Sequence, residues 1–327
     1  MTPRVLVLRA LGLGDLLAGV PALRALRSAL PGHRLVLAAP EALRPLVELS
    51  GAVDELLPTG ELEPVPWSGP PPEVAVDLHG NGPASKRLLE ALEPGRLVAF
   101  AGPGGDGRPV AGLEWDPEEH ERTRWCRLVE HTFGVAGDPG DLRLAVPSRA
   151  PSVAGAVVVH VGAASGSRRW PEERFAAVAR AVAAAGERVV LTGSGAERPS
   201  LERVRGAAGL PADAVAGRTD LAELAALVAA ARLVVCGDTG VAHLASAYAT
   251  PSVVLFGPTP PNRWGPPARG PHDALWHGIG SGDPHGADPD PALLRITVPE
   301  VLERVDVRLG RPPARRPAAR RSTGPSA

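Results

Sequence analysis

The sequence predicts an α/β protein made of two doubly wound domains, each built around a parallel β-sheet. The chain has 327 residues, more than one hydrophobic core usually serves, so two domains are expected. Short runs rich in Val and Leu alternate with segments of helical period along most of the chain. The runs are continuously apolar, as strands buried on both faces of a sheet must be. This favours parallel sheets covered by helices.

The first half of the chain contains the first series of strands and helices. An apolar run at 4–8 predicts a strand, and the helix after it is expected to kink at Gly19 and Pro21. The stretches 64–72 and 102–112 contain too much Pro and Gly for regular structure and are expected to be loops. The elements expected are strands at 4–8, 34–38 and 73–78 and helices at 15–30 and 122–133.

A second series begins after the Pro-bounded segment 147–152, which suits a linker. The sequence therefore predicts an N-terminal domain over 1–150 and a C-terminal domain over 151–310. The tail, 311–327, contains five arginines and no acids among Pro and Ala, so it is expected to be disordered. The elements expected in the second domain are strands at 156–161, 188–192, 233–236 and 252–256 and helices at 171–185, 220–231 and 240–248.

Composition and charge exclude several classes of protein. The formal net charge is -1, which argues against binding to nucleic acid through bulk charge. Lys86 is the one lysine among 35 basic residues, a bias that indicates GC-rich coding. No stretch reads as a signal peptide or a membrane span, and Cys126 and Cys236 stand in unrelated settings. We therefore expect a cytoplasmic protein with free thiols.

The first candidate functional residue is Asp15, which follows the first strand in the segment LGLGDLL. Gly12 and Gly14 begin a Gly-x-Gly-x-x-Gly pattern, but Leu17 occupies its third position. A dinucleotide-binding fold places pyrophosphate at this helix N-terminus, where an aspartate would repel it. Asp15 therefore indicates either a helix cap or a catalytic base, and the spacing alone leaves both open.

In the second half, the segment SGSRRWP indicates an anion-binding site. It joins a strand to a helix whose first residue is expected to be Pro171. The hydroxyls of Ser165 and Ser167 stand beside the guanidinium groups of Arg168 and Arg169. Because helix N-termini and guanidinium groups both bind anions, this interpretation is favoured over an ordinary surface loop.

The turn CGDTGVAH, again between a strand and a helix, is a second candidate for anion binding. Asp238 or Thr239 can cap the helix, whose first N–H groups, beginning near Gly240, then point outward. Thr239 and His243 are four residues apart and therefore lie on one helical face. Glu197 follows another glycine turn, GSGAE, where its carboxylate could accept hydrogen bonds from ribose hydroxyls.

Two further pairs of polar residues have an alternative structural interpretation. His79 and Asn81 follow the strand at 73–78 and are candidates either for contact with an acceptor or for a structural turn. Asp288 and Asp290 form an Asp-x-Asp pair of the kind that can ligate a divalent cation. Because they lie in a Pro- and Gly-rich loop with a proline between them, no metal site is expected.

The chain resembles glycosyltransferase family 9, the ADP-heptose:lipopolysaccharide heptosyltransferase family. The resemblance rests on the order and spacing of LGLGD with PAL, SRRWP, GSGAE, GDTGVAH, LFGPT and WGP, over nearly the whole chain before the tail. It implies the GT-B architecture, in which two Rossmann-like domains face a cleft. The acceptor is then bound mainly by the first domain and the nucleotide sugar mainly by the second. Arg168 stands where the family commonly has lysine.

The resemblance also implies inverting transfer of a heptose from ADP-heptose to a hydroxyl of a cell-envelope glycan or glycolipid. Asp15 is then the general base, and the helix N-terminus is expected to keep it ionised rather than to raise its basicity. Gly14, His79 and Asn81 belong to the acceptor side. The expected donor-binding residues are Ser165, Ser167, Arg168, Glu197, Asp238, Thr239, Gly240 and His243.

No metal cofactor is expected if cations and a helix terminus bind the diphosphate, and no nucleic acid is expected. The enzyme is expected to be a monomer that meets a membrane only through its acceptor. Three alternatives stay open. The first is another GT-B enzyme that uses a different nucleotide sugar, as a transferase or as a sugar-nucleotide epimerase. The second is a nucleotide- or sugar-binding protein without activity, which the presence of Asp15 disfavours. The third is an NAD(P)-dependent dehydrogenase, which the interrupted glycine pattern disfavours.

Overall fold

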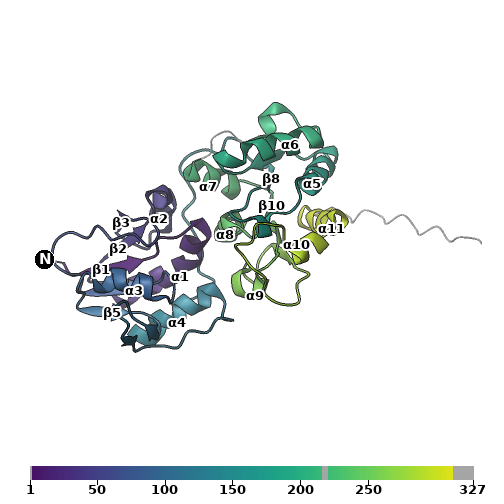
Figure 1. Cartoon of the computed structure of the whole chain (residues 1–327). Coiled ribbons are helices and arrows are strands. Elements are labelled where there is room, and N and C mark those ends of the chain that lie inside the picture. The colour runs from purple at the N-terminus through teal and green to yellow at the C-terminus, as the bar shows by residue number, and fades with distance from the viewer. Residues whose placement is uncertain (1, 216–219, 312–327) are drawn as a thin grey trace, which may run out of the picture.

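The computed structural model describes residues 2–215 and 220–311. Apart from Arg311, the tail that was expected to be disordered lies outside the described residues. The chain forms two α/β units side by side (Figure 1). We call them the N-terminal unit, 4–133, and the C-terminal unit, 157–308. No helix in the described part of the chain is long and apolar enough to cross a membrane.

The first sheet is parallel throughout and has the strand order β3-β2-β1-β4-β5. The strands expected at 4–8, 34–38 and 73–78 are confirmed to within one residue at each end. The third and fifth strands of the unit were not predicted, because they lie at the two edges of the sheet and each has only one buried residue. The strands are β1 (Arg4–Leu8), β2 (Arg34–Ala39), β3 (Glu55–Pro58), β4 (Val74–Asp77) and β5 (Arg96–Val98).

The helices expected at 15–30 and 122–133 are also confirmed, and the first runs without interruption through Gly19 and Pro21. The expectation that 102–112 lacks regular structure was wrong in part. Two-residue strands β6 (Gly102–Pro103) and β7 (Pro109–Val110) pair there, and Gly107 allows the tight turn between them with its φ of +85°. The helices of this unit are α1 (Leu13–Ala29), α2 (Arg44–Ser50), α3 (Pro83–Glu90) and α4 (Glu121–Phe133).

The second sheet is also parallel, with the order β12-β11-β10-β8-β9. The four expected strands are confirmed to within one residue and the three expected helices to within two. Pro171 is the N-cap of its helix, not the first residue, because its ψ of 136° is extended. The strands are β8 (Val157–His160), β9 (Val189–Thr192), β10 (Leu233–Gly237), β11 (Ser252–Leu255) and β12 (His272–Leu275).

Seven helices of the second unit lie within the described residues, and four of them were not predicted. Helices α5, α6 and α11 cover one face of the second sheet, and α7 and α8 cover the other. The helices are α5 (Glu172–Ala184), α6 (Arg198–Ala208), α7 (Leu221–Ala229), α8 (Gly240–Ala247), α9 (Pro261–Trp264), α10 (Pro291–Arg295) and α11 (Val298–Arg308).

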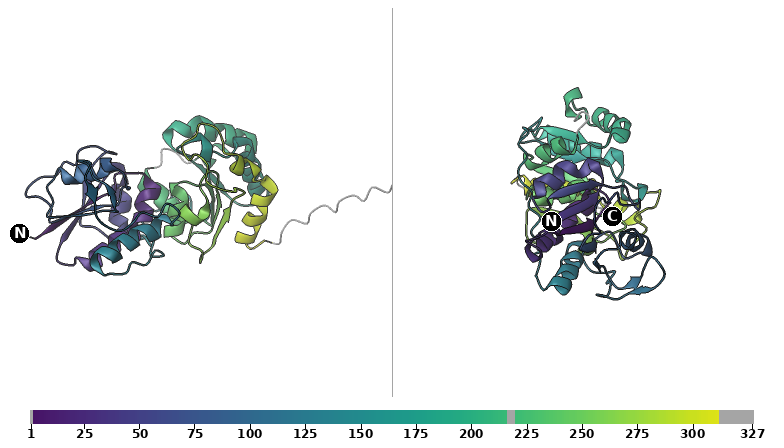
Figure 2. Two further views of the ribbon diagram at one scale, coloured as in Figure 1. Left: turned by 60° about the horizontal axis from the view of Figure 1, so that its bottom comes forward. Right: turned by 90° about the vertical axis from the view of Figure 1, so that its left-hand side faces the viewer.

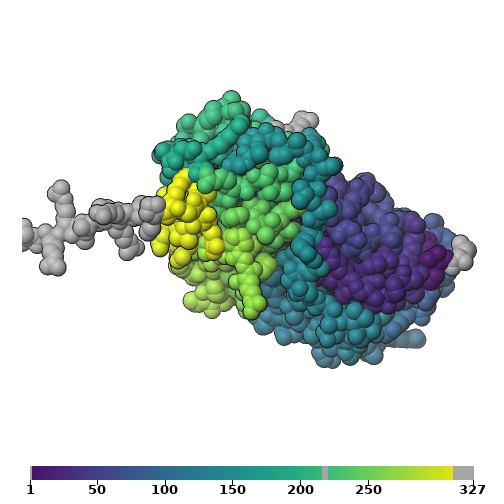
Figure 3. Space-filling model, turned by 180° about the vertical axis from the view of Figure 1, so that it is seen from behind, coloured from purple at the N-terminus to yellow at the C-terminus, as the bar shows by residue number. Residues whose placement is uncertain are grey.

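One hydrophobic core runs through both units. Buried side chains of β1, β2, α1 and α4 form a single apolar cluster with those of α7, α8 and one face of the second sheet. The thiols of Cys126 and Cys236 lie in this cluster and are free, as expected. The units also adjoin over their boundary when the molecule is seen from behind (Figure 3). Because an extensive apolar interface opposes domain motion, this core holds the two sheets in one relative position.

A close backbone approach across the boundary joins the N-termini of α1 and α8. Figure 2 shows the two helices adjacent at the junction of the units. A Cβ on Gly240 would lie 2.6 Å from Cγ of Leu13, and one on Gly14 would lie 3.1 Å from Cδ2 of His243. Two glycines therefore let the backbones of the two turns meet.

A buried ionic cluster connects the turn before α1 to the start of α4. Arg9, which follows β1, is completely buried and donates to Oε1 of Glu121 at 3.1 Å. Arg9 also donates to the carbonyl oxygens of Asp15 and Leu78. Glu121 accepts from Arg124 at 2.6 Å and from Nε1 of Trp125 at 2.7 Å. The Glu121 carboxylate thus pairs with two buried guanidinium groups.

Replacing Glu121 with alanine is expected to destabilise the protein by about 3 kcal/mol or more, because Arg9 and Arg124 would stay buried without the carboxylate that they share. Urea-induced unfolding measures the change. Glu41→Ala is the matched control, because Glu41 also accepts two hydrogen bonds from an arginine, Arg44, but on the exposed surface. It should leave the free energy of unfolding nearly unchanged. Equal losses in the two variants would contradict this account.

Candidate functional site

The two glycine turns singled out in the sequence lie against each other at the boundary of the units. One turn joins β1 to α1 and carries Asp15, and the other joins β10 to α8 and carries Asp238. Both stand at the carboxyl ends of parallel strands, where open α/β sheets bind their ligands. Residues more than 200 positions apart in the chain therefore face one place.

Asp15 is the third residue of α1, and Gly12 occupies the N-cap position. Its Oδ2 accepts a hydrogen bond from the N–H of Gly12 at 3.3 Å, as the third residue of a capping box does. Its side chain is 30% exposed, and Nη2 of Arg9 lies 3.8 Å from Oδ1. The carboxylate is therefore both anchored and accessible to a ligand.

Burial raises the pKa of Asp15 above its ordinary value, and the charge of Glu121 acts in the same direction. The charge of Arg9 and the hydrogen bond from Gly12 oppose this effect without cancelling it. The expectation that the helix N-terminus leaves the basicity of Asp15 unraised was therefore wrong. Desolvation outweighs the charge of Arg9 and the backbone hydrogen bonds to this carboxylate.

The acceptor-side candidates of the N-terminal unit do not share one environment. Gly14 lies against His243 of the other unit. His79 is half-buried, and burial together with the charge of Arg9 lowers the pKa of its imidazole. Asn81 donates to the carbonyl of Ala101 at 3.2 Å and accepts from Nζ of Lys86 at 2.9 Å. The amide of Asn81 thus has structural partners on both sides.

Thr239 is the N-cap residue of α8, but its side chain does not cap the helix. Its Oγ1 is buried and has no hydrogen-bond partner among the described residues. Within the same part of the chain, the N–H groups of Thr239 and Gly240 have no backbone acceptor. These donors at a helix N-terminus suit an anion.

Asp238 precedes these donors and is 7% exposed. Burial raises the pKa of its carboxyl to about 6, although the charge of Arg168 acts against this rise. The nearby guanidinium therefore offsets part of the cost of holding Asp238 ionised beside an anion site.

His243 lies one helical turn into α8 and is 6% exposed. Burial lowers the pKa of its imidazole to about 3, and the charge of Arg122 contributes. The ring packs edge-on against Trp264, with 5.7 Å between centroids. At neutral pH the side chain is therefore uncharged and can exchange hydrogen bonds but cannot supply a positive charge.

Arg168 ends the short 3₁₀ turn after β8 and lies beside the α8 turn. Its Nε donates to Oγ of Ser165 at 3.1 Å, and its Nη1 approaches the carbonyl of Asp238 at 3.4 Å. It forms no ion pair with any described residue, so its charge is available to a ligand. Arg169 is exposed and donates to the carbonyl of Ala163 at 3.1 Å.

The two serines of this turn hold it in place. Ser165 donates to the carbonyl of Pro284 at 2.5 Å, and its Oγ lies 3.3 Å from that of Ser167. Ser167 is buried, and its backbone exchanges hydrogen bonds with Gly286 and Asp290. The Ser165 hydroxyl therefore orients Arg168, and together with the Ser167 backbone it ties the loop at 283–290 to this turn.

Glu197 connects the loops after β8 and β9. Its two carboxylate oxygens accept from the N–H groups of Ala163 at 3.0 Å and Ser194 at 2.7 Å. Each oxygen keeps a free lone pair, so the carboxylate can still accept from a sugar hydroxyl. These two hydrogen bonds fix the Glu197 carboxylate between the loop after β8 and the loop after β9.

Asp288 and Asp290 have different surroundings. Asp288 is exposed, whereas Asp290 is the N-cap of α10 and accepts from the N–H of Ala292 at 2.7 Å. Helix capping accounts for the second aspartate. The residues that the structure describes include no cluster of three or more His, Cys, Asp or Glu arranged to hold a metal ion.

Sequence reasoning missed the cationic residues behind this site. Arg9 follows an apolar strand, and an arginine at the end of a buried strand is the signal that could have revealed it. Arg122 is 6% exposed, and its Nε and Nη1 have no partner in the described chain. In the sequence, Arg122 begins a predicted helix, where arginines are commonly exposed. No local signal therefore reveals that it is buried.

Comparisons with known proteins agree with this arrangement. The model of the family described as "Glycosyltransferase family 9 (heptosyltransferase)" matches residues 113–276, about half of the chain. Lipopolysaccharide heptosyltransferase 2 of Escherichia coli K12 is 25% identical over 352 residues, which cover 94% of this chain and 98% of that protein.

Two solved structures show the same fold. A family 9 glycosyl transferase from Veillonella parvula superposes with a TM-score of 0.76 at 20% identity, covering 94% of this chain and 97% of that one. The E. coli heptosyltransferase WaaC with ADP gives a TM-score of 0.68 at 20% identity, with 93% and 97% covered. The expected architecture of two Rossmann-like domains is thereby confirmed. The chain belongs to glycosyltransferase family 9 and is a heptosyltransferase-like enzyme of the GT-B fold.

Proposed function

We propose that this enzyme transfers a heptose from ADP-heptose, with inversion, to a hydroxyl of a cell-envelope glycan or glycolipid. The observation that carries the proposal is the contact between the turns of Asp15 and Thr239, which brings an accessible carboxylate and an anion site to one place. The names of the relatives support the donor: one is a lipopolysaccharide heptosyltransferase, and another structure contains ADP.

In this mechanism Asp15 accepts the proton of the attacking acceptor hydroxyl. The hydroxyl oxygen forms a bond to the anomeric carbon while the bond from that carbon to the diphosphate oxygen breaks. ADP leaves on the opposite face, so the configuration inverts. Because its pKa is raised, Asp15 is a stronger base than an ordinary aspartate and is better matched to neutral pH.

The leaving diphosphate gains negative charge as the bond breaks. We assign its stabilisation to Arg168 and to the N–H groups of Thr239 and Gly240, assisted by the Thr239 hydroxyl. Arg168 presents a forked donor that spans two oxygens, whereas the lysine common in the family is a point charge. Asp238 holds the turn that presents these donors.

Further roles follow from position. Glu197 would accept from the ribose hydroxyls, and Ser165 and Ser167 would orient Arg168. His243 would border the phosphate or the heptose as a neutral hydrogen-bonding group, with Gly14, His79 and Asn81 toward the acceptor. The cationic and N–H donors supply charge stabilisation, so we propose a reaction without a metal cofactor.

We also propose that the enzyme works as a monomer in the cytoplasm and meets the membrane only through its acceptor. The domain limit falls between 150 and 151 in this account. That point lies within the irregular segment between α4 and β8.

The donor is tested first by thermal-shift measurements with ADP, UDP, GDP, NAD(P) and the corresponding nucleotide sugars. We expect ADP and ADP-heptose to raise the melting temperature most, since bound ligand stabilises the folded state. Turnover of the best donor should persist in EDTA. Stabilisation by NAD(P) and by no nucleoside diphosphate would refute the proposed function, and loss of activity in EDTA would refute the metal-free mechanism.

Replacing Asp15 with asparagine or alanine should lower kcat by roughly 10²–10⁴-fold while leaving the affinity for ADP nearly unchanged. For the wild type, kcat at saturating donor should fall as the pH drops through the raised pKa of Asp15, because the protonated acid is no base. In Asp15→Asn this acid limb should disappear. Asp106→Asn, on the exposed β6–β7 turn, serves as the control; normal turnover by Asp15→Asn would remove Asp15 from the mechanism.

Replacing Arg168 with alanine should weaken ADP binding by roughly thirtyfold, the cost of a charge-assisted contact, as measured by calorimetry. Arg168→Lys should keep appreciable activity because the charge remains. The neighbouring exposed Arg169 provides the matched control, and Arg169→Ala should bind ADP as the wild type does. Equal losses for Arg168→Ala and Arg169→Ala would show that the effect is only one of net charge.

A further inference from the structure

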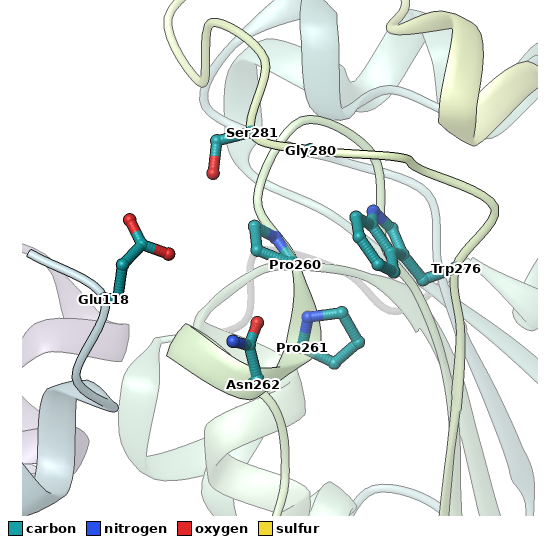
Figure 4. Close-up of a pocket in the computed structure, with 7 residues that line it drawn as sticks. All are labelled: Glu118, Pro260, Pro261, Asn262, Trp276, Gly280 and Ser281. Atoms are coloured by element: carbon teal, nitrogen blue, oxygen red, sulfur yellow. The ribbon is translucent and has the colours of Figure 1, made fainter.

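A hollow of about 530 Å³ opens between the two units at the carboxyl edge of the second sheet. Figure 4 shows Glu118, from the N-terminal unit, facing the loops of the C-terminal unit across it. None of its lining residues has a role in the site described above. They are Glu118, Pro260, Pro261, Asn262, Trp276, Gly280 and Ser281.

The strand order places this hollow on one side of the Thr239 turn and Glu197 on the other. The sheet runs β12-β11-β10-β8-β9. Glu197, the proposed ribose ligand, follows β9, and Thr239 follows β10. The C-terminal residues of the hollow follow β11 and β12 instead. A nucleotide sugar that lies along this edge with its ribose near Glu197 therefore directs its sugar toward the hollow.

The chemistry of the lining suits a neutral, hydroxyl-rich ligand. Trp276, Pro260 and Pro261 offer apolar surface, and the amide of Asn262, the hydroxyl of Ser281 and the carboxylate of Glu118 offer donors and acceptors. Glu118 is the one charged residue in the lining, and Arg263 lies 3.8 Å from its carboxylate, so the two charges offset each other around the hollow. The volume falls within the roughly 300–1,000 Å³ typical of small-molecule pockets.

The walls of the hollow are fixed before any ligand binds. Nε1 of Trp276 donates to the carbonyl of Gly257 at 3.0 Å, and a Cβ on Gly278 would lie 2.3 Å from the Trp276 ring. Arg263 donates to Oγ of Ser281 at 3.0 Å and lies 3.8 Å from the Glu118 carboxylate. Such preorganisation lowers the entropic cost of binding.

We propose that this hollow is a sugar-binding subsite that accepts a neutral pyranose ring, either the sugar of the donor or a sugar unit of the acceptor. The apolar face of the ring lies against Trp276, and its hydroxyls bond to Asn262, Ser281 and Glu118. The assignment rests on the proposed function for the orientation of the nucleotide, but the hollow itself can be tested separately.

The test uses saturation-transfer NMR with methyl α-D-mannopyranoside as the probe and the enzyme saturated with ADP. The wild type is expected to transfer saturation to the ring protons. Asn262→Ala and Glu118→Gln should each bind the probe roughly fivefold more weakly, the cost of one lost hydrogen bond. Glu114→Gln is the matched control, since Glu114 is an exposed glutamate of the same segment outside the lining, and it should bind as the wild type does.

Each outcome bears on the proposal. Equal binding by Asn262→Ala, Glu118→Gln and the wild type, or no transfer to the probe in the wild type, overturns it. Tighter binding of mannose 6-phosphate than of methyl α-D-mannopyranoside at the same residues also overturns the proposal. Failure of the wild type to bind ADP in calorimetry refutes the proposed function instead, and the glycoside titration without ADP still tests the hollow.

The source of the sugar is distinguished by replacing ADP with ADP-heptose in the Asp15→Asn variant. Loss of the probe signal only with ADP-heptose assigns the hollow to the donor sugar, because the donor then occupies it. Retention of the signal with ADP-heptose bound assigns it to the acceptor. With ADP alone, the probe signal should depend on Asn262 in both cases.

Discussion

The site depends on the close packing of the N-terminus of α1 against that of α8. The contact holds only because glycines occupy the meeting points, and a side chain at Gly240 would collide with Leu13. Around it, helices of both units share one apolar core, which resists separation of the sheets. Without this packing, Asp15 and the donors of Thr239 would belong to separate domains at no defined distance.

The electrostatics of the site follow from the same packing. Burial raises the pKa of Asp15 and Asp238 and lowers that of His243, so the interface favours a reactive base and a neutral histidine. Arg9 is completely buried and pairs with Glu121, so it positions the first turn and does not reach a ligand. Arg168 lacks a carboxylate partner among the described residues and keeps its charge for the diphosphate.

The sequence reveals what is local in this fold and little of what joins distant segments. The two glycine turns were predictable because each follows a continuous apolar run and opens a helix. The ion pair between Arg9 and Glu121 joins residues 112 positions apart, and nothing near either residue indicates it. Three-residue β5 and the β6–β7 hairpin form because neighbouring segments supply their partners, which local periodicity cannot show. The raised pKa of Asp15 depends on burial by the fold, so its place at a helix N-terminus did not predict it.

The arrangement is tested most directly by a crystal structure of the Asp15→Asn variant with ADP-heptose. The account predicts the diphosphate on the N–H groups of Thr239 and Gly240 and the residue 15 side chain on the opposite face of the sugar. Its distance to the anomeric carbon should be about 6 Å or less, which leaves room for one hydroxyl between them. A diphosphate bound elsewhere, or residue 15 on the same face as the leaving group, would contradict the account.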